Sequence, residues 1–365
     1  MPSRQDIPLF DSCDFLDSKR IPIAAVDRRP GPYPYCGANG IQDFIDDFIF
    51  DDELVLLAED GGNFGSKDKP IAYRISGKCW VNNHAHVLKP KHGIDADYLC
   101  YSLMFYPINN LVNGSTRLKL TQSAMRKIKI PIISYESQKQ VVSKLKNIEH
   151  LIDIRQQQIS KLEQLVKSQF IVLTSGRDVS KVKLSSVVER DICKIKTKFK
   201  PEDEIEYIDI SSIDNVKHII SQTSTFLTKD APSRAQQLVL NNDVLVSTVR
   251  PNLRNIAMSQ KTSLNRVASS GFCVLRPKTI VPSFLFAIAM SDDFTNYLVR
   301  NTTGANYPAV SSKIILEYEI PLLPRHDQEL FAQYCKQVDK SKFTIEQSLK
   351  KLETLKRSLM NKYFG

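Results

Sequence analysis

Residues 127–170 read KIKIPIISYESQKQVVSKLKNIEHLIDIRQQQISKLEQLVKSQF, and residues 317–360 read EYEIPLLPRHDQELFAQYCKQVDKSKFTIEQSLKKLETLKRSLM. The two segments align without a gap at a separation of 190 residues. Identical residues in this alignment include Ile130 and Ile320, Pro131 and Pro321, Gln138 and Gln328, Lys161 and Lys351, and Leu165 and Leu355. A period of 190 residues indicates a duplicated domain, because the repeats of solenoid proteins are only about 20–50 residues long.

The similarity extends upstream of these segments, into globular sequence. Gly114 in NGSTRLKL aligns with Gly304 in TGANYPAV at the same separation, and HVLKPK (86–91) resembles CVLRPK (273–278). Short apolar runs bounded by glycine-rich turns, with a helical stretch in each later half, predict a mixed α/β fold for both globular parts. We predict a pseudo-two-fold internal repeat with a globular domain at 1–133, a long helix at 134–173, a second globular domain at 174–323 and a second long helix at 324–365.

The segment 137–172 contains no proline or glycine, and its apolar residues recur at alternating spacings of three and four, as in a coiled-coil seam. The predicted seam comprises Leu145, Ile148, Ile152, Ile159, Leu162 and Val166 in the first copy and Val338, Ile345, Leu349, Leu352 and Leu359 in the second. Thirty-six residues of helix would span roughly 54 Å. Because polar residues interrupt both seams, we expect the helices to pack on each other as an antiparallel coiled coil that separates the two domains. In the alternative, each helix packs only on its own domain.

The composition is that of a globular protein, with 365 residues, 42% hydrophobic content and 25% charged content. We find no run of 18 apolar residues and no apolar leader segment, and therefore expect a cytoplasmic protein. The seven cysteines are scattered and never spaced as C-x-x-C, which argues against a disulfide framework and a zinc site. The formal net charge of +10 favours a polyanionic partner such as nucleic acid.

Common catalytic motifs are missing from the sequence. The glycines of GGNFGSK (61–67) do not have the spacing of a phosphate-binding loop, and no G-x-G-x-x-G, E-x-K, H-E-x-x-H or Asn-Pro-Pro-aromatic motif occurs. His84 and His86 in NNHAH could form a metal pair, but without a third ligand we interpret them as exposed strand residues. We therefore expect a non-catalytic recognition protein without a metal or cofactor of its own.

At this point the sequence resembles a known family, the specificity subunits of type I restriction–modification systems. The paired arrangement of two different domains and two near-identical helices is typical of that family. Local phrases are also similar, including PYPYCGANGI (32–41) and KIPIISYESQKQVVSKL (129–145) in the first half, and EYIDISSID (206–214) and EIPLLPRHDQELFAQ (319–333) in the second. The resemblance covers nearly the whole chain.

The resemblance implies a function for each part of the chain. Each target-recognition domain would read one half of a bipartite DNA sequence, and the helices would set the spacing and dock two methyltransferase subunits. Those partners would carry S-adenosylmethionine, and two restriction subunits, where they exist, would use ATP and Mg²⁺. The chain would then act in host defence in the cytoplasm of a bacterium or archaeon.

Candidate DNA-binding residues are polar, basic or aromatic side chains in turns that allow close approach to bases or phosphates. In the second domain, STVRPNLRN (247–255) offers two arginines that could reach guanine or phosphate. The first-domain candidates are Tyr33, Tyr35, Asn39, Asn63, Ser66, Lys67, Ser115, Arg117 and Lys119. The second-domain candidates are Lys229, Ser233, Arg234, Ser247, Thr248, Arg250, Asn252, Arg254, Asn306 and Tyr307. Each of these stretches could instead form an ordinary surface turn.

A second interpretation also fits the repeat and the charge. The chain could be a non-catalytic coiled-coil scaffold whose basic face binds protein or RNA. Enrichment of two short DNA motifs at a fixed spacing would favour the first interpretation over this one.

Overall fold

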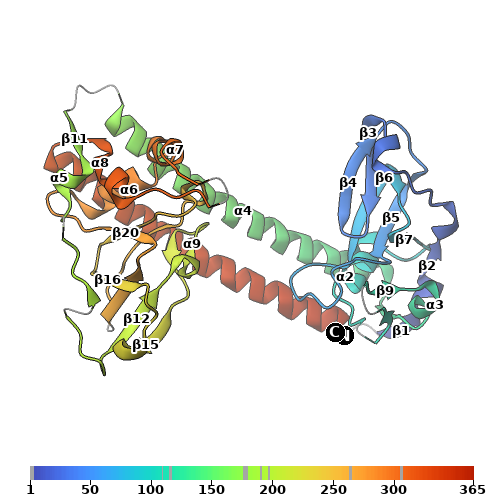
Figure 1. Ribbon diagram of the computed structural model, residues 1–365. Coiled ribbons are helices and arrows are strands. Elements are labelled where there is room, and N and C mark those ends of the chain that lie inside the picture. Colours follow the sequence, from blue (N-terminus) through green and yellow to red (C-terminus); the bar gives the residue numbers. More distant parts are fainter. Residues whose placement is uncertain are drawn as a thin grey trace. The chain divides into compact units, whose positions relative to one another are not determined.

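The computed structural model describes residues 4–108, 110–114, 117–175, 180–189, 191–195, 198–262, 265–304 and 307–365. The chain divides into two compact units, Met1–Gln156 with Gln347–Gly365, and Gln157–Glu346 (Figure 1). Each unit mixes strands and helices and contains one end of both long helices, which confirms the predicted fold class. None of the helices in the described parts of the chain is long and apolar enough to cross a membrane.

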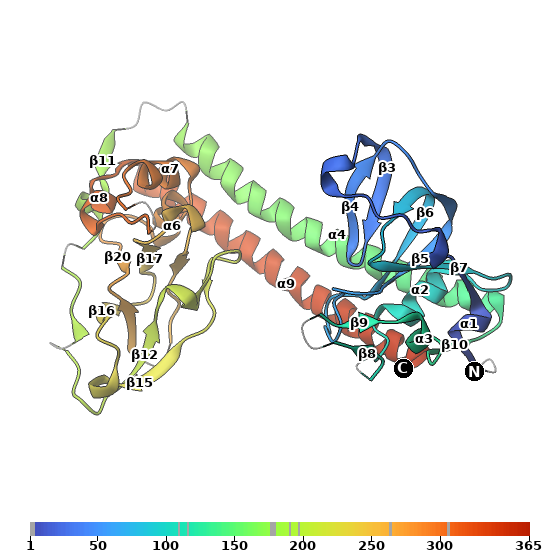
Figure 2. The same cartoon turned by 45° about the vertical axis from the view of Figure 1, so that its right-hand side comes forward.

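A six-stranded sheet with the order β2-β7-β5-β6-β3-β4 forms the centre of the first unit (Figure 2). Its strands are β2 (Cys13–Phe15), β3 (Pro30–Gly37), β4 (Gly40–Ile45), β5 (Phe50–Ala58), β6 (Ala72–Val81) and β7 (Ala85–Pro90). Neighbouring strands are antiparallel except β3 and β6, which run parallel. Strand β5 is buried from Leu54 to Ala58, as its continuous apolar sequence predicts for a central strand.

Both faces of this sheet carry apolar clusters. Helix α2 (Ala96–Met104) contributes Leu99 to one buried cluster, which also contains Val55 and Leu88. A separate cluster contains Leu54. The other described elements of the unit are β1 (Gln5–Pro8), α1 (Leu9–Ser12), η1 (Asp17–Lys19), η2 (Ala25–Asp27), β8 (Val112–Asn113), β9 (Lys119–Leu120), α3 (Gln122–Met125) and β10 (Lys129–Ile132).

The second unit contains a four-stranded sheet, β15-β12-β19-β16, and a three-stranded sheet, β18-β17-β20. Their strands are β12 (Glu204–Ile208), β15 (Ser224–Leu227), β16 (Ala235–Val239), β17 (Val244–Ser247), β18 (Ile256–Met258), β19 (Asn265–Ser269) and β20 (Phe272–Leu275). Helix α6 (Pro282–Ala289) contributes Phe284 to the main apolar cluster, together with Val244 and Leu275. The other described elements are β11 (Lys181–Lys183), α5 (Leu184–Val187), η4 (Ile210–Ser212), β13 (Ile213–Asp214), β14 (Ile219–Ile220), η5 (Thr228–Asp230), η6 (Pro251–Leu253), α7 (Asp292–Arg300), α8 (Ser312–Glu317) and β21 (Glu319–Pro321).

A two-stranded antiparallel ladder joins the first strand of each globular domain to the strand that precedes its long helix. In the first unit β1 pairs with β10, with Ile7 opposite Ile130. In the second unit β11 pairs with β21, with Val182 opposite Ile320. Ile130 and Ile320 are equivalent in the repeat, and both are fully buried. The duplication therefore retains this ladder, although the sheets of the two units differ.

Helices α4 (Tyr135–Thr174) and α9 (Arg325–Phe364) pack on each other in both units. In the first unit, Leu145 near the start of α4 lies in one cluster with Leu359 near the end of α9. In the second unit, the ring of Phe170 near the end of α4 lies 5.9 Å from the ring of Phe331 near the start of α9. The helices are therefore antiparallel, and the alternative in which each packs only on its own domain is wrong.

Every residue of the predicted helix seam is buried or half-buried. Lysines that interrupt the apolar spacing pair with glutamates of the opposite helix, at 2.8 Å between Lys356 and Glu149 and at 2.7 Å between Lys342 and Glu163. The pattern of exposed and half-buried residues is the same, position by position, at 161–175 and 351–365. The repeat thus extends from the sequence to the surface that each helix presents.

One buried glutamine anchors the start of each long helix. Gln138 accepts a hydrogen bond of 2.8 Å from the backbone N–H of Asp95 and donates one of 2.8 Å to the carbonyl of Ile133. Gln328 accepts one of 2.9 Å from the N–H of Val281 and donates one of 2.8 Å to the carbonyl of Leu323. Asp95 and Val281 are the N-cap residues of α2 and α6, so each glutamine joins a long helix to a helix of its domain.

Replacing Gln138 by methionine should destabilise the protein, because a side chain of similar shape would leave the Asp95 N–H and the Ile133 carbonyl without their partner. We expect a loss of about 1–3 kcal/mol in the free energy of unfolding, measured by urea denaturation followed by circular dichroism. The control is Gln140→Met at an exposed position of the same helix, which should change stability by less than about 0.5 kcal/mol. Equal losses in both variants would contradict the anchoring role.

Candidate nucleic-acid interface

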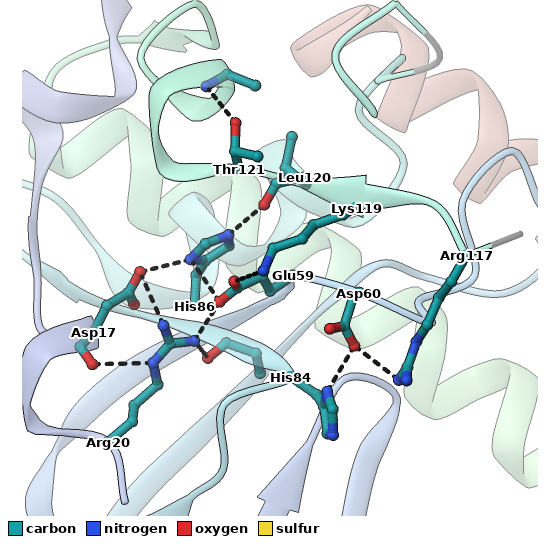
Figure 3. Close-up of polar contacts among 12 residues, drawn as sticks. Asp17, Arg20, Glu59, Asp60, His84, His86, Arg117, Lys119, Leu120 and Thr121 are labelled. Carbon is teal, nitrogen blue, oxygen red and sulfur yellow. Dashed lines mark hydrogen bonds and ion pairs between the residues drawn. The ribbon is translucent and has the colours of Figure 1, made fainter. Parts of the chain in front are cut away.

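Four segments that are distant in the sequence meet around Asp60 and Gly61 in the first unit, and Figure 3 shows Asp60 with His84 and Arg117. Asn39, in the turn between β3 and β4, donates a hydrogen bond of 2.9 Å to the carbonyl of Gly61. The carboxylate of Asp60 lies 2.6 Å from Nδ1 of His84 and 2.8 Å from the guanidinium of Arg117. The predicted loops around Asn39, Asn63 and Arg117 are therefore parts of one surface rather than separate turns.

Gly61 allows this close approach. Its φ of +60° lies in the left-handed region, and a Cβ atom at this position would lie 2.8 Å from Nη2 of Arg117. A larger residue would therefore strain the backbone and push the guanidinium away from Asp60. The glycine places Arg117 against the turn that follows β5.

A charged cluster around the buried His86 lies beside this surface (Figure 3). His86 places Nδ1 2.6 Å from the carboxylate of Asp17 and Nε2 2.7 Å from the carbonyl of Leu120. Glu59 pairs with Arg20 at 2.6 Å and with Lys119 at 2.9 Å. The cluster thus ties the strand β9, which follows Arg117, to β5 and β7 of the sheet.

Both ring nitrogens of His86 face an oxygen atom of a neighbouring residue. The carbonyl of Leu120 can only accept a hydrogen bond, so Nε2 must donate. Burial raises the pKa of Asp17, but the hydrogen bond and charge of His86, the N–H of Val87 and the charge of Arg20 outweigh it and hold the pKa below its ordinary value. Asp17 is therefore ionised at neutral pH, and its carboxylate can only accept hydrogen bonds.

The expectation that both histidines are exposed is wrong for His86, which is buried, and His84 is half-exposed. Among the described residues, one set of three possible metal ligands falls within 4.8 Å, namely Asp17, Glu59 and His86. The guanidinium of Arg20 and the ammonium of Lys119 already balance these carboxylates. We therefore assign the cluster a structural role as an ion-pair network.

The first-domain candidates occupy different environments. Tyr35 is buried. Its hydroxyl accepts a hydrogen bond from the N–H of Ile23 and donates one to the carbonyl of Ile23, so the side chain holds the backbone at Ile23 and its hydroxyl is not presented to a ligand. Tyr33 packs with its ring 5.1 Å from the ring of Phe48. Asn63 donates to the carbonyl of Pro70, and the hydroxyl of Ser66 accepts from the N–H of Lys69. The exposed candidates are Asn39, Ser66, Lys67, Arg117 and Lys119, and Ser115 lies outside the described residues.

The predicted loops of the second unit also meet. The carbonyl of Thr248 accepts from the N–H of Val310, and the N–H of Arg250 donates to the carbonyl of Pro308, each at 2.8 Å. The turn between β19 and β20 joins a third loop, because Ser270 donates to the carbonyl of Arg234 and Gly271 accepts from Thr248. The stretches 228–236 and 247–255 and the residues 303–304 and 307–310 therefore form one surface.

Two arginines flank the turn η6 in left-handed backbone conformations, with φ of 47° at Arg250 and 50° at Arg254. This conformation is uncommon for residues other than glycine and marks a local cost in free energy. Arg254 is ion-paired with Asp292 of α7, whereas the exposed Arg250 lies 5.1 Å from the ring centre of the exposed Tyr307. Arg250 is thus the arginine of this loop that is presented to solvent.

The other second-domain candidates are placed as follows. Ser247 is buried and donates to the carbonyl of Val249, so it holds the turn together. Lys229, Ser233, Arg234 and Asn252 are exposed, and Asn306 lies outside the described residues.

Our sequence reasoning missed the hairpin β13–β14, which contacts the η6 turn through a hydrogen bond of 3.2 Å from Asn215 to the carbonyl of Leu253. The Asp-Asn pair at 214–215, between two isoleucine-containing segments, was the available signal for this turn.

Comparisons with known proteins agree with one another. The model of the family described as "Type I restriction modification DNA specificity domain" matches residues 5–164 and 177–357. A putative type I restriction enzyme specificity subunit of Haemophilus influenzae is 33% identical over 135 residues, which are 37% of this chain and 34% of that protein. The MjaVIII type I restriction enzyme specificity subunit of Methanocaldococcus jannaschii is 25% identical over 97% of this chain and 90% of its own length.

Solved structures share the fold. The crystal structure of a type I restriction–modification S subunit from M. genitalium has a TM-score of 0.61 at 13% identity, over 100% of this chain and 96% of that one. A chain from a structure that addresses complex assembly and conformational transition of the type I R-M system has a TM-score of 0.60 at 14% identity, over 100% and 98%. At these identities the likeness concerns the fold.

The buried charged cluster should make the stability of the protein depend on pH in the acidic range. Burial raises the pKa of Glu59, but hydrogen bonds and charges of Lys119, Arg20 and His86 outweigh it, so its pKa, like that of Asp17, lies below the ordinary value. Depressed carboxyl pKa values stabilise the fold above the unfolded-state values, which are about 4. This stabilisation should be lost as the pH falls through the lower folded-state values.

We expect the free energy of unfolding, measured by urea denaturation between pH 7 and pH 2, to fall more steeply in the wild type than in Asp17→Asn. The variant should also lose about 1–3 kcal/mol at pH 7, because His86 loses its charged partner. Asp14→Asn, an exposed neighbour on β2, is the matched control and should follow the wild-type curve. Parallel curves for the wild type and Asp17→Asn would show that Asp17 does not carry the acid dependence.

Proposed function

Because this chain belongs to the family of type I restriction–modification DNA specificity domains, we propose that it supplies the DNA address of a modification complex, with each unit reading one half of a bipartite target. The observation that carries the proposal is the pair of loop surfaces, one in each unit, built on the repeated helix frame. Each surface gathers glycine turns, amides and basic side chains from distant segments. The formal net charge of +10 favours a polyanionic ligand such as DNA.

The exposed residues of the two surfaces divide into base-reading and phosphate-binding candidates. Arg250 and Asn252 extend from a rigid turn, and arginine and asparagine can each form two hydrogen bonds with a purine edge in the major groove. Lys67, Lys229 and Arg234 lie in flanking loops, where a positive charge would serve phosphate contacts. Arg117 and Lys119 are exposed but already ion-paired, so their contact with DNA would exchange a carboxylate for a phosphate.

The long helices would set the distance between the half-sites and dock two methyltransferase subunits. Leu165 and Leu355 are identical in the repeat, and each exposes about half of its surface, 51% and 47% respectively. Two equivalent exposed leucines within matching surface patterns suit two identical partners. Those partners would bind S-adenosylmethionine and transfer its methyl group to adenine, and restriction subunits would use ATP and Mg²⁺. This chain would be non-catalytic.

The experiment that tests the function is co-expression of the chain with its methyltransferase subunit, followed by methylome sequencing. The expected result is methylation at one bipartite motif with a fixed gap, which disappears when the gene for this chain is deleted. Methylation of adenines without sequence preference would overturn the proposal. Selection from randomised duplexes separates it from the scaffold alternative, which predicts no enriched DNA motif.

Arg250→Ala should weaken binding of the complex to its target by about 1–3 kcal/mol and relax specificity at one base pair in one half-site, because one base-edge contact is lost. The measurement is equilibrium binding at constant salt, with a panel of duplexes that differ at single positions. Arg250→Lys keeps the charge without the two-pronged geometry and should relax specificity as well. Arg300→Ala removes an exposed arginine at the end of α7 and should leave the specificity unchanged.

Inserting four residues after Gln157 and four after Gln347, which are equivalent in the repeat, should lengthen the gap between the two half-motifs. Four helical residues add roughly 6 Å, and one base pair occupies about 3.4 Å of duplex, so we expect an increase of one to two base pairs. Replacing residues 156–158 by alanines keeps the helix length and should leave the gap unchanged. A gap in the methylome that does not respond to the insertions would rule out the helices as spacers.

A further inference from the structure

The hairpin β13–β14 presents an apolar side chain where a turn ordinarily carries polar residues. Its turn runs from Asp214 to His218, and Val216 at the tip has 82% of its surface exposed. Lys217 beside it is also exposed. A single exposed valine is ordinary on a protein surface, and Val216 differs from that case in how firmly its turn is held and in which turn lies beside it.

The turn is held rigidly by its own polar groups. The carboxylate of Asp214 accepts hydrogen bonds of 3.0 Å and 2.9 Å from the backbone N–H groups of Val216 and Lys217. The N–H of His218 donates to the carbonyl of Asp214 at 2.7 Å, with His218 in a left-handed conformation at φ 56°. Ile213, at the base of the hairpin, is buried in an apolar cluster of the second unit. Val216 is therefore fixed in position while its side chain remains in solvent.

The hairpin is joined to the turn that presents Arg250. The side-chain amide of Asn215 donates a hydrogen bond of 3.2 Å to the carbonyl of Leu253, the last residue of η6. The backbone N–H of Leu253 in turn donates one of 2.9 Å to the carbonyl of Arg250. Leu253 is itself exposed. The hairpin that carries Val216 is thus hydrogen-bonded to the turn that carries Arg250 and Asn252, and the exposed Lys217 lies next to Val216 in the sequence.

The chemistry of the DNA major groove gives such a point a specific partner. The base edges there offer hydrogen-bond donors and acceptors, and the C5-methyl group of thymine is the apolar group among them. An apolar side chain held among groups that suit phosphates and purine edges can contact this methyl. A lysine next to it places a positive charge toward the backbone of the same strand or its neighbour.

We propose that Val216 contacts the C5-methyl group of a thymine in the half-site that the second unit reads. This inference rests on the proposed DNA-specificity function and adds a reading element that lies outside the loops 228–236, 247–255 and 303–310. The hairpin and the η6 turn would then read neighbouring positions, one through apolar contact and one through hydrogen bonds.

The test replaces thymine by uracil, which removes the methyl group and keeps the base pairing. Binding of the methyltransferase complex is measured with the target that methylome sequencing defines. In each modified duplex, uracil replaces every thymine of one half-site on both strands, and the other half-site is left unchanged. In one half-site the replacement should weaken wild-type binding about fourfold, the effect of burying one methyl-sized group. In Val216→Ala the same replacement should have no effect, because the partner of the methyl group is already lost.

Val26→Ala is the matched control, since Val26 is 91% exposed and lies in the first unit. It should leave the response to uracil in the Val216-dependent half-site as in the wild type. A target without thymine in either half-site, or equal uracil effects in the wild type and Val216→Ala, would overturn the inference. So would a loss of methyltransferase assembly in Val216→Ala with unchanged DNA recognition, which would assign Val216 to a protein contact. Failure of the proposed function would show differently, as methylation without a motif.

Discussion

A buried amide at the start of each long helix is the interaction on which the rest of the frame depends. Gln138 and Gln328 each satisfy a backbone N–H at the N-cap of a domain helix and a carbonyl just before the long helix. The amide is suited to this role because it offers a donor and an acceptor without charge, so its burial carries no ionic desolvation cost. These hydrogen bonds fix the orientation of each globular domain relative to the start of its own long helix. The orientation of the loop surface of that domain is fixed with it.

The two units achieve surfaces of similar composition by different means. In the first, the carboxylate of Asp60 pairs with His84 and Arg117, and a charged cluster around His86 holds the neighbouring strand β9. In the second, backbone hydrogen bonds join the loops, and two arginines in strained conformations flank a short turn. Backbone strain of this kind persists when the surrounding contacts determine it, which keeps Arg250 in place before any ligand arrives. The helix frame is shared, whereas the local chemistry is specific to each unit.

The repeated elements were predictable from the sequence because their signals are local or periodic. Heptad spacing and the absence of proline predict the long helices, and alignment at 190 residues pairs Ile130 with Ile320. The burial of Tyr35, the convergence of four loops on Asp60 and the contact between Asn215 and Leu253 were not predictable, because each depends on tertiary contacts between distant segments. His86 was misread for the same reason: an alternating pattern does not reveal a carboxylate 69 positions away. The role of Gln138 also stayed hidden, since a glutamine near a helix start is ordinarily solvated.

In the ladders β1–β10 and β11–β21, the first and last strands of each globular domain pair with each other. The chain enters and leaves each globular domain through adjacent antiparallel strands, so the two ends of the domain lie side by side. A segment whose ends are adjacent can be exchanged for another without altering the path of the chain outside it. The sheets of the two domains have already diverged in strand number and order while the ladders kept their form. Recombination at these ladders would therefore exchange a whole globular domain. A chain with a different DNA specificity would then arise in one step, with its long helices unchanged.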